Sequence, residues 1–289
     1  MSSHVSRRAV LVGAAAGPWL GACTAFGNSA DSLAALETDT GGRLGVMALD
    51  TASGRQVAHR AQERFALCST FKVLAAAAVL RDGTASLGQR VRYRREDLVT
   101  YSPVTGKHVT EGMTVGELCA AALQYSDNTA GNLLIDRLGG PAAVTAYARS
   151  IGDASFRLDR RETELNTAIP GDPRDTGTPG SMARNLQRLL LGDALPPAGR
   201  AQLEAWMRGN TTGATRIRAG VPGGWAVADK TGAGDYGVVN DIGIAWPPDR
   251  APIVLAIYFT QERKDAPMRS EVVATAARIA VNRLVQGAS

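Results

Sequence analysis

The sequence predicts a fold of the α+β class, in which strands from both ends of the chain form one sheet and the middle of the chain forms a helical part. Short apolar or alternating stretches bounded by Gly, Pro or other turn residues lie before residue 60 and after residue 220, and such stretches are typical of strands. From Thr70 onward the intervening sequence is rich in Ala and Leu at helical spacing. We therefore expect a helical part inserted between the two halves of one sheet.

The N-terminal contribution to the sheet is expected to be a hairpin. Residues 43–50 read Arg-Leu-Gly-Val-Met-Ala-Leu-Asp, a strand pattern that ends at the turn-forming stretch 51–54. Residues 56–59 then supply the partner strand.

The middle of the chain is expected to hold helices at residues 72–80, 115–123, 129–138 and 142–151. Gly139-Gly140-Pro141 separates the last two, because Gly ends a helix and Pro begins one. Residues 166–180 hold three Pro and three Gly, which predicts a long irregular loop. Loops of that length in compact domains usually carry function.

The C-terminal contribution is expected to be three strands, at residues 225–230, 241–246 and 253–261, followed by a helix at 270–285. The domain boundaries that follow are a sheet part at 31–65 and 209–289 and a helical part at 66–208. The helical part includes the loop 160–176.

Residues 1–30 have the features of an export signal. Arg7 and Arg8 lie in a twin-arginine-like motif, and the apolar stretch 9–22 is too short to span a bilayer as a helix. We therefore expect a periplasmic protein. Two processing routes stay open: cleavage and lipidation at Cys23, which would be the only link to a membrane, and cleavage at small residues near 28–30, which would release a soluble protein.

The charge and residue composition exclude several classes of protein. The formal net charge is +5, or about +3 without Arg7 and Arg8, and no run of Lys and Arg reaches five residues, so we expect no nucleic-acid partner. The three His residues have no metal-ligand spacing. No Gly-rich phosphate loop follows the signal, and we expect neither a metal nor a cofactor.

Four short motifs occur in one order along the chain: Ser69-Thr70-Phe71-Lys72, Ser126-Asp127-Asn128, Glu162-Thr163-Glu164-Leu165-Asn166 and Lys230-Thr231-Gly232. A Ser three residues before a Lys at a helix start places both on one face, where a desolvated Lys can activate the hydroxyl. With 15 Ser and four Lys, chance alone gives about 0.2 Ser-x-x-Lys matches in this chain, so that motif by itself is a weak signal. The Ser-x-x-Lys, Ser-Asp-Asn and Lys-Thr-Gly motifs would arise together by chance in only roughly two of ten thousand such chains.

These motifs resemble those of class A serine β-lactamases and penicillin-binding proteins. The segments 101–105, 168–172 and 174–176 also resemble class A segments in their expected order, and the similarity runs from about residue 31 to 287. It is strongest to the chromosomal penicillinase-like branch. The resemblance implies an antiparallel sheet flanked by helices beside an all-helical subdomain, with the active site between them. It also implies a monomer that hydrolyses penicillins and some cephalosporins.

The resemblance implies a role for each motif residue. Ser69 is the nucleophile, Lys72 its partner as direct base or proton relay, Ser126 the donor to the lactam nitrogen, and Glu162 the base that activates the deacylating water with Asn166. The resemblance also implies contacts with the substrate. Asn128 holds its side-chain amide, Arg216, Lys230 and Thr231 hold its carboxylate, and Gly232 allows its close approach to the backbone. The N–H groups of Ser69 and Ala233 form the oxyanion hole, and Tyr101 is a wall of the cleft, unless it is a half-buried core residue. Arg160 and Asp175 are expected to pair across the neck of the loop.

The cysteines depart from two patterns in the family. Some members pair the position of Cys119 with a Cys where this chain has Ala76, and carbapenemases pair the position of Cys68 with a Cys where this chain has Gly234. We expect neither disulfide.

Two other functions stay open: a cell-wall transpeptidase or carboxypeptidase, and a sensor that is acylated once by a β-lactam. Neither would need the motif that begins at Glu162.

Overall fold

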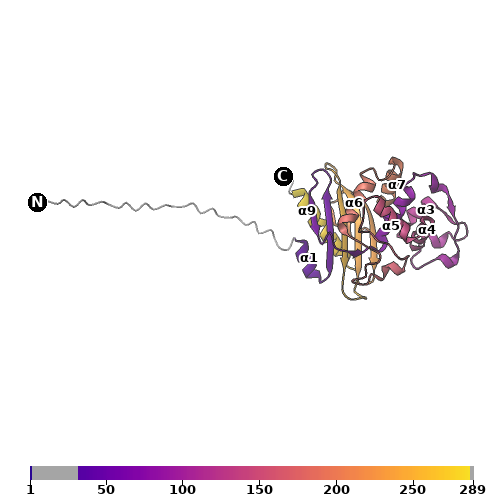
Figure 1. The fold of residues 1–289 in the computed structure, drawn as a ribbon, viewed down its shortest axis with the longest axis horizontal. Coiled ribbons are helices and arrows are strands. Elements are labelled where there is room, and N and C mark those ends of the chain that lie inside the picture. The colour runs from indigo at the N-terminus through magenta and orange to yellow at the C-terminus, as the bar shows by residue number, and fades with distance from the viewer. Residues whose placement is uncertain (2–31, 287–289) are drawn as a thin grey trace.

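The computed structural model describes Met1 and residues 32–286. The predicted export signal, including Cys23, lies outside these residues except for Met1. The described chain has a sheet part and a helical part that lie side by side (Figure 1). The helices α1 and α9 lie on the side of the sheet that faces away from the helical part. The sheet was predicted from both ends of the chain, and this prediction is confirmed.

The sheet has five antiparallel strands in the order β2-β1-β9-β8-β7. Their bounds are β1 (Arg43–Asp50), β2 (Gln56–His59), β7 (Ala226–Gly234), β8 (Val238–Trp246) and β9 (Ile253–Thr260). The strands β7 and β8 are longer than predicted because their hairpin runs through a Gly-rich stretch that reads as loop. The Lys-Thr-Gly motif therefore lies within an edge strand, with Thr231 opposite Asp241.

The two faces of the sheet are both buried, and side chains alternate between them. In β9, residues 253, 255, 257 and 259 pack with the helix α9 (Ser270–Gln286), and residues 254, 256 and 258 pack toward the helical part. The helices α1 (Leu33–Thr40) and α8 (Ile217–Gly220) join α9 on the first face, and α6 (Pro179–Leu190) covers the second. Coverage of the antiparallel sheet on both faces explains why its central strand β9 is almost wholly apolar.

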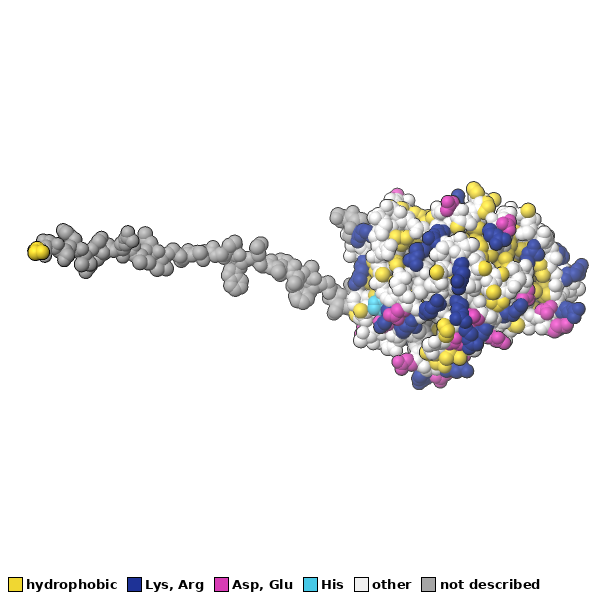
Figure 2. Space-filling view, viewed as in Figure 1, with side chains coloured by type: hydrophobic (Ala, Val, Ile, Leu, Met, Phe, Trp, Pro, Cys, Tyr) yellow, Lys and Arg dark blue, Asp and Glu magenta, His cyan; other side chains and the backbone are white. Residues whose placement is uncertain are grey.

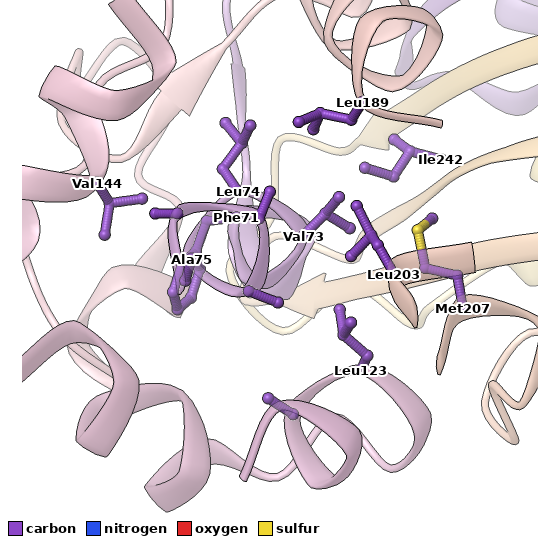
Figure 3. Packing of buried hydrophobic residues seen from close by; sticks show 14 of the residues in the cluster. Phe71, Val73, Leu74, Ala75, Leu123, Val144, Leu189, Leu203, Met207 and Ile242 are labelled. Carbon is purple, nitrogen blue, oxygen red and sulfur yellow. The ribbon is translucent and has the colours of Figure 1, made fainter. Parts of the chain in front are cut away.

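The helical part is built around α2 (Lys72–Leu80), whose nine residues are all buried. Its small Ala side chains allow α3 (Val115–Gln124), α4 (Asn128–Leu138), α5 (Pro141–Ser150) and α7 (Pro197–Arg208) to approach closely. Figure 3 shows Leu123 of α3, Val144 of α5 and Leu203 and Met207 of α7 converging on α2. All four helices predicted for this region are confirmed, and their common core holds α2 in place.

In the described residues, the structure differs from the prediction in four α-helices and four short strands. The helices α1, α6, α7 and α8 were not predicted, and α6 packs on the sheet although it lies in the predicted helical part. That part is also not all-helical, because it contains the paired strands β4 (Arg90–Val91) and β5 (Met113–Thr114). It also contains β6 (Thr176–Gly177), which pairs with β3 (Phe65–Ala66) at the predicted boundary between the two parts. The short 3₁₀ helices are η2 (Cys68–Phe71), η3 (Ala85–Gly88), η4 (Arg95–Asp97), η5 (Thr105–Lys107) and η6 (Glu164–Thr167).

The surface carries both kinds of charge. On the face drawn in Figure 2, basic side chains are spread over both parts of the molecule with acidic ones among them. In the part of the chain that the structure describes, no helix is long and apolar enough to cross a membrane.

Candidate active site

Ser69 lies in the 3₁₀ turn η2, which continues directly into α2. Lys72 is one turn further on, and its Nζ donates to Ser69 Oγ at 2.9 Å. The preceding residue, Cys68, has a φ of +44°, a conformation that costs energy for a non-Gly residue. The predicted Ser69–Lys72 pair is therefore present, with Ser69 only 7% exposed.

Glu162 completes a buried triangle with this pair. Its Oε1 accepts a hydrogen bond from Ser69 Oγ at 2.9 Å and lies 2.9 Å from Lys72 Nζ. Both charged side chains are fully buried. Burial lowers the pKa of Lys72, and the negative charge of Glu162 opposes that shift. The structure thus brings the carboxylate of Glu162 to a hydroxyl that lies 93 residues before it in the sequence, and to the amine next to that hydroxyl.

The loop that carries Glu162 is anchored at several points. Asn166 Nδ2 donates to Glu162 Oε2 at 2.5 Å, and Asn166 Oδ1 is buried with no hydrogen-bond partner in the described chain. The predicted pair is present, since Arg160 Nε donates to Asp175 Oδ2 at 2.5 Å across the neck of the loop.

Asn132 is a site residue that the sequence analysis missed. Its side chain accepts from the N–H of Glu162 at 2.9 Å and donates to the carbonyl of Glu162 at 2.8 Å. It lies four residues after Asn128, and therefore one turn along the same face of α4. That spacing was a signal for it, but only the fold shows which loop it holds.

Ser126 and Asn128 flank the start of α4. Asp127 caps this helix, and its carboxylate also accepts two N–H bonds from the segment at 104–105. Asn128 Oδ1 accepts from Lys72 Nζ at 2.8 Å, and Asn128 Nδ2 donates to the carbonyl of Thr100 at 2.9 Å. The amide predicted to hold substrate thus also positions the catalytic amine.

The opposite wall is the edge strand β7. Lys230 Nζ donates to Ser126 Oγ at 2.9 Å and so links the two walls. Burial lowers the pKa of Lys230 well below its usual value, and the positive charges of Lys72 and Arg216 lower it further. Thr231 Oγ1 lies 2.5 Å from Thr212 Oγ1. Ala233 follows on the same edge strand.

Gly232 allows a close approach that differs from the predicted one. A Cβ atom at this position would lie 2.9 Å from the carbonyl oxygen of Leu67. Gly232 therefore lets β7 pack against the segment that carries Ser69, and a close approach by substrate stays a prediction. Tyr101 is 57% exposed, so the alternative of a half-buried core tyrosine is wrong.

Arg216 and Arg218 point to different places, and neither is a free surface residue. Arg216 is 9% exposed, and its Nη1 donates to the carbonyls of Gly232 at 2.8 Å and Asn240 at 2.7 Å. Arg218 instead pairs with the buried Asp229 at 2.6 Å. Both arginines therefore contact β7, Arg216 at Gly232 and Arg218 at Asp229, and substrate binding by Arg216 stays a prediction.

The two remaining cysteines are buried and free. A Cβ atom at Gly234 would lie 2.8 Å from Cys68 Sγ, so the position compared with the carbapenemase cysteine is indeed adjacent. Within residues 32–286, no group of three or more His, Cys, Asp or Glu side chains is placed to hold a metal ion.

A cavity of about 730 Å³ lies apart from these residues. It opens between the loop segment 168–174 and the ends of β1 and β9, and its walls include Phe65, Ile169 and Pro170. None of the side chains of Ser69, Lys72 and Glu162 lines this cavity.

Comparisons with known proteins agree with this geometry. Residues 28–284 match the model of a family described as the β-lactamase enzyme family. The chain is 55% identical over 286 residues to β-lactamase OXY-2 of Klebsiella oxytoca, covering 96% of this chain and 99% of that protein. It is 54% identical to β-lactamase CTX-M-8 of Citrobacter amalonaticus, covering 96% and 98%. The crystal structure of a β-lactamase from Desulfarculus baarsii superposes with a TM-score of 0.86 at 59% identity, covering 89% of this chain and 97% of that one.

Proposed function

The chain belongs to the β-lactamase enzyme family, as a class A serine β-lactamase that hydrolyses β-lactam antibiotics, and from that premise we propose the roles of its residues. Such hydrolysis confers antibiotic resistance. Ser69 attacks the lactam carbonyl, so that an ester bond forms at Oγ and the ring C–N bond breaks. Water then cleaves the ester, and the opened product leaves with Ser69 restored.

Glu162 accepts the proton of Ser69 during acylation. Lys72 Nζ has four oxygen atoms within 2.9 Å: Ser69 Oγ, the Ser126 carbonyl, Asn128 Oδ1 and Glu162 Oε1. An ammonium with three hydrogens satisfies this surrounding better than a neutral amine with two. Because an ammonium cannot accept a proton, the carboxylate at 2.9 Å from Ser69 Oγ is the better base in this arrangement. Lys72 then stabilises the charges that develop.

The lactam nitrogen receives its proton through Ser126. The hydroxyl of Ser126 accepts from Lys230 Nζ at 2.9 Å, and a hydroxyl can accept and donate at once. A proton given to the leaving nitrogen is replaced along this contact. The link is supported by the burial of Lys230, which favours loss of its proton.

Deacylation uses the same carboxylate for a different proton. The proton that Glu162 took from Ser69 passes to solvent and Lys230 regains one from solvent, which balances the proton delivered to the lactam nitrogen. Once Ser69 Oγ is esterified, it has no hydrogen to donate, and the restored carboxylate can accept a proton from a water molecule and later return it to Ser69 Oγ. Asn166 Oδ1, buried without a partner in the described chain, lies on the same side chain that holds Glu162 Oε2 and can accept the second hydrogen of that water. This pair of acceptors is the observation that carries the proposal of turnover over permanent acylation.

The sheet wall holds the substrate. Lys230, Thr231 and Arg216 bind its carboxylate, the N–H groups of Ser69 and Ala233 hold the oxyanion, and Asn128 and Tyr101 contact its side chain. In the described chain neither Lys230 nor Arg216 has a carboxylate within 4.0 Å, so their charges are open to an anion. We propose penicillins and some cephalosporins as substrates.

The protein's location and assembly complete the proposal. We propose a monomer that is exported to the periplasm by the twin-arginine route. It is released by cleavage near 28–30 or held at a membrane by a lipid on Cys23.

Turnover of a chromogenic cephalosporin tests the function. Purified protein should hydrolyse many equivalents, whereas a sensor would stop after one and a transpeptidase would show only slow release. Intact-mass spectrometry during the reaction should find a transient adduct of one substrate mass. A stable adduct with no further colour change would contradict the proposal.

A further inference from the structure

Two acidic side chains are wholly buried behind the sheet wall and have no role in the mechanism above. Asp229 on β7 is matched, because Arg218 Nε donates to its Oδ1 at 2.7 Å and Asn210 Nδ2 donates to its Oδ2 at 2.6 Å. Asp241 on β8 is matched only in part. Its Oδ2 accepts from the N–H of Ile217 at 3.0 Å, and its Oδ1 has no partner in the described part of the chain.

The single contact of Asp241 falls on the peptide that follows Arg216. Ile217 is the first residue of α8, so its N–H has no acceptor within the helix. Asp241 supplies one. The contact fixes the backbone at the point where the side chain of Arg216 departs toward β7.

The guanidinium of the same arginine is held by the neighbouring residue of β8. Arg216 Nη1 donates to the carbonyl of Asn240, directly before Asp241, and to the carbonyl of Gly232 across the strand pair. Of two successive residues of β8, Asn240 therefore accepts from the guanidinium of Arg216, and Asp241 accepts from the peptide N–H that follows Arg216. A shift of the Ile217 peptide would move the guanidinium relative to Lys230 and Thr231.

The protonation of Asp241 also depends on this wall. Its burial raises its pKa and Asp229 raises it further, whereas Arg216 and Lys230 act in the opposite direction. A carboxylate in direct contact with the guanidinium would compete with the carboxylate of a substrate. Asp241 instead contacts the backbone, and Arg216 has no ion pair in the described chain that would compete with a substrate.

We propose that Asp241 is a positioning residue for substrate binding, which holds the Arg216 segment so that its guanidinium meets the substrate carboxylate. The inference rests on the role proposed above for Arg216. It predicts that loss of Asp241 weakens binding of a β-lactam only as long as Arg216 is present.

A double-mutant cycle on the whole enzyme tests it, with benzylpenicillin as substrate. Asp241→Leu removes the acceptor of the Ile217 N–H and should raise KM about tenfold with kcat within about twofold. Asp241→Asn keeps an acceptor for Ile217 and should raise KM about threefold or less. In an Arg216→Ala background, Asp241→Leu should not raise KM further. If Asp241→Leu does not fold, Asp241→Ser, which leaves room for water, enters the same cycle.

The matched control is Asp229→Asn, a change in the other buried carboxylate. It should lower the Tm but leave KM within about twofold of the parent. An equal rise of KM in this control, or additive effects of Asp241→Leu and Arg216→Ala, would overturn the positioning role. A parental KM in Asp241→Leu, when Arg216→Ala raises KM, would also overturn it. A parental KM in Arg216→Ala would instead contradict the proposed role of Arg216 itself.

Discussion

The two walls of the active site differ in the partners of their cationic side chains. On the helical wall, Lys72 contacts an acidic side chain directly, at 2.9 Å from Glu162. On the sheet wall, Lys230 and Arg216 contact hydroxyl and carbonyl oxygens, and in the described chain neither has a carboxylate within 4.0 Å. A paired cation serves proton transfer within the protein, whereas unpaired cations retain attraction for an anion from outside. The difference separates a wall for chemistry from a wall for binding.

The most severe way to break the helical wall is to remove its nucleophile. Ser69→Ala eliminates the covalent route, and we expect kcat to fall at least about 10⁴-fold. Intact-mass spectrometry with excess benzylpenicillin should find no adduct. Lys72 and Glu162 keep their 2.9 Å contact in this variant, so the fold and Tm should stay close to those of the parent. An adduct on the mutant would mean that another residue is the nucleophile.

Removal of Glu162 should separate the two halves of the reaction. Glu162→Ala leaves the ester without a base, and turnover should fall about 10²–10⁴-fold. Acylation should persist, because Lys72 loses its counter-charge and its burial then favours a neutral amine that can accept the proton of Ser69. The acyl-enzyme should therefore accumulate and be visible by mass. Parental turnover of benzylpenicillin would exclude Glu162 as the deacylating base.

The sheet wall should respond through binding and not through chemistry. Arg216→Ala removes a charged hydrogen bond to the substrate carboxylate that is worth about 1.5–3 kcal/mol, so kcat/KM for penicillins should fall about ten- to a hundredfold. The loss should lie mostly in KM. Steady-state kinetics with benzylpenicillin measure it.

Arg218→Ala is the matched control for this wall. It leaves the buried Asp229 with only Asn210 as a partner, so Tm should fall by roughly 5 °C while KM stays near that of the parent. Equal small effects of the two arginine changes on KM would remove Arg216 from the binding wall.

The local parts of this site were predictable from sequence, and the long-range parts were not. Ser69 and Lys72 are three residues apart on one helix turn, so their contact follows from helix geometry alone. The contacts of Arg216 with Gly232 and Asn240 depend on how α8 docks on a strand pair, and nothing in the local spacing specifies that docking. The sequence analysis therefore placed Arg216 beside the cleft but missed its anchors and Asp241.

The same contrast applies to the fold. The strand β1 was predicted with its observed bounds because its turn residues are local signals. The helix α6 was missed although Thr178 caps it and Pro179 begins it, since both residues belong to a stretch rich in Pro and Gly that reads as loop. Its amphipathic face is stabilised by the sheet, which is a tertiary contact.

The smallest expected effect concerns the seam between the walls, where Cys68 lies against Gly234 of β7 while Cys119 lies inside the helical wall. Burial raises the pKa of both thiols, that of Cys119 to about 12, so neither forms the reactive thiolate at neutral pH. Protein processed before residue 31 should take up no thiol reagent while folded and two equivalents after denaturation without reductant, with unchanged β-lactam turnover in the folded, treated sample. Uptake of none after denaturation would mean that the two cysteines are bonded. Rapid uptake by the folded protein at Cys68 alone would mean instead that the two walls separate at this seam, and a rigid division between chemistry and binding would no longer hold.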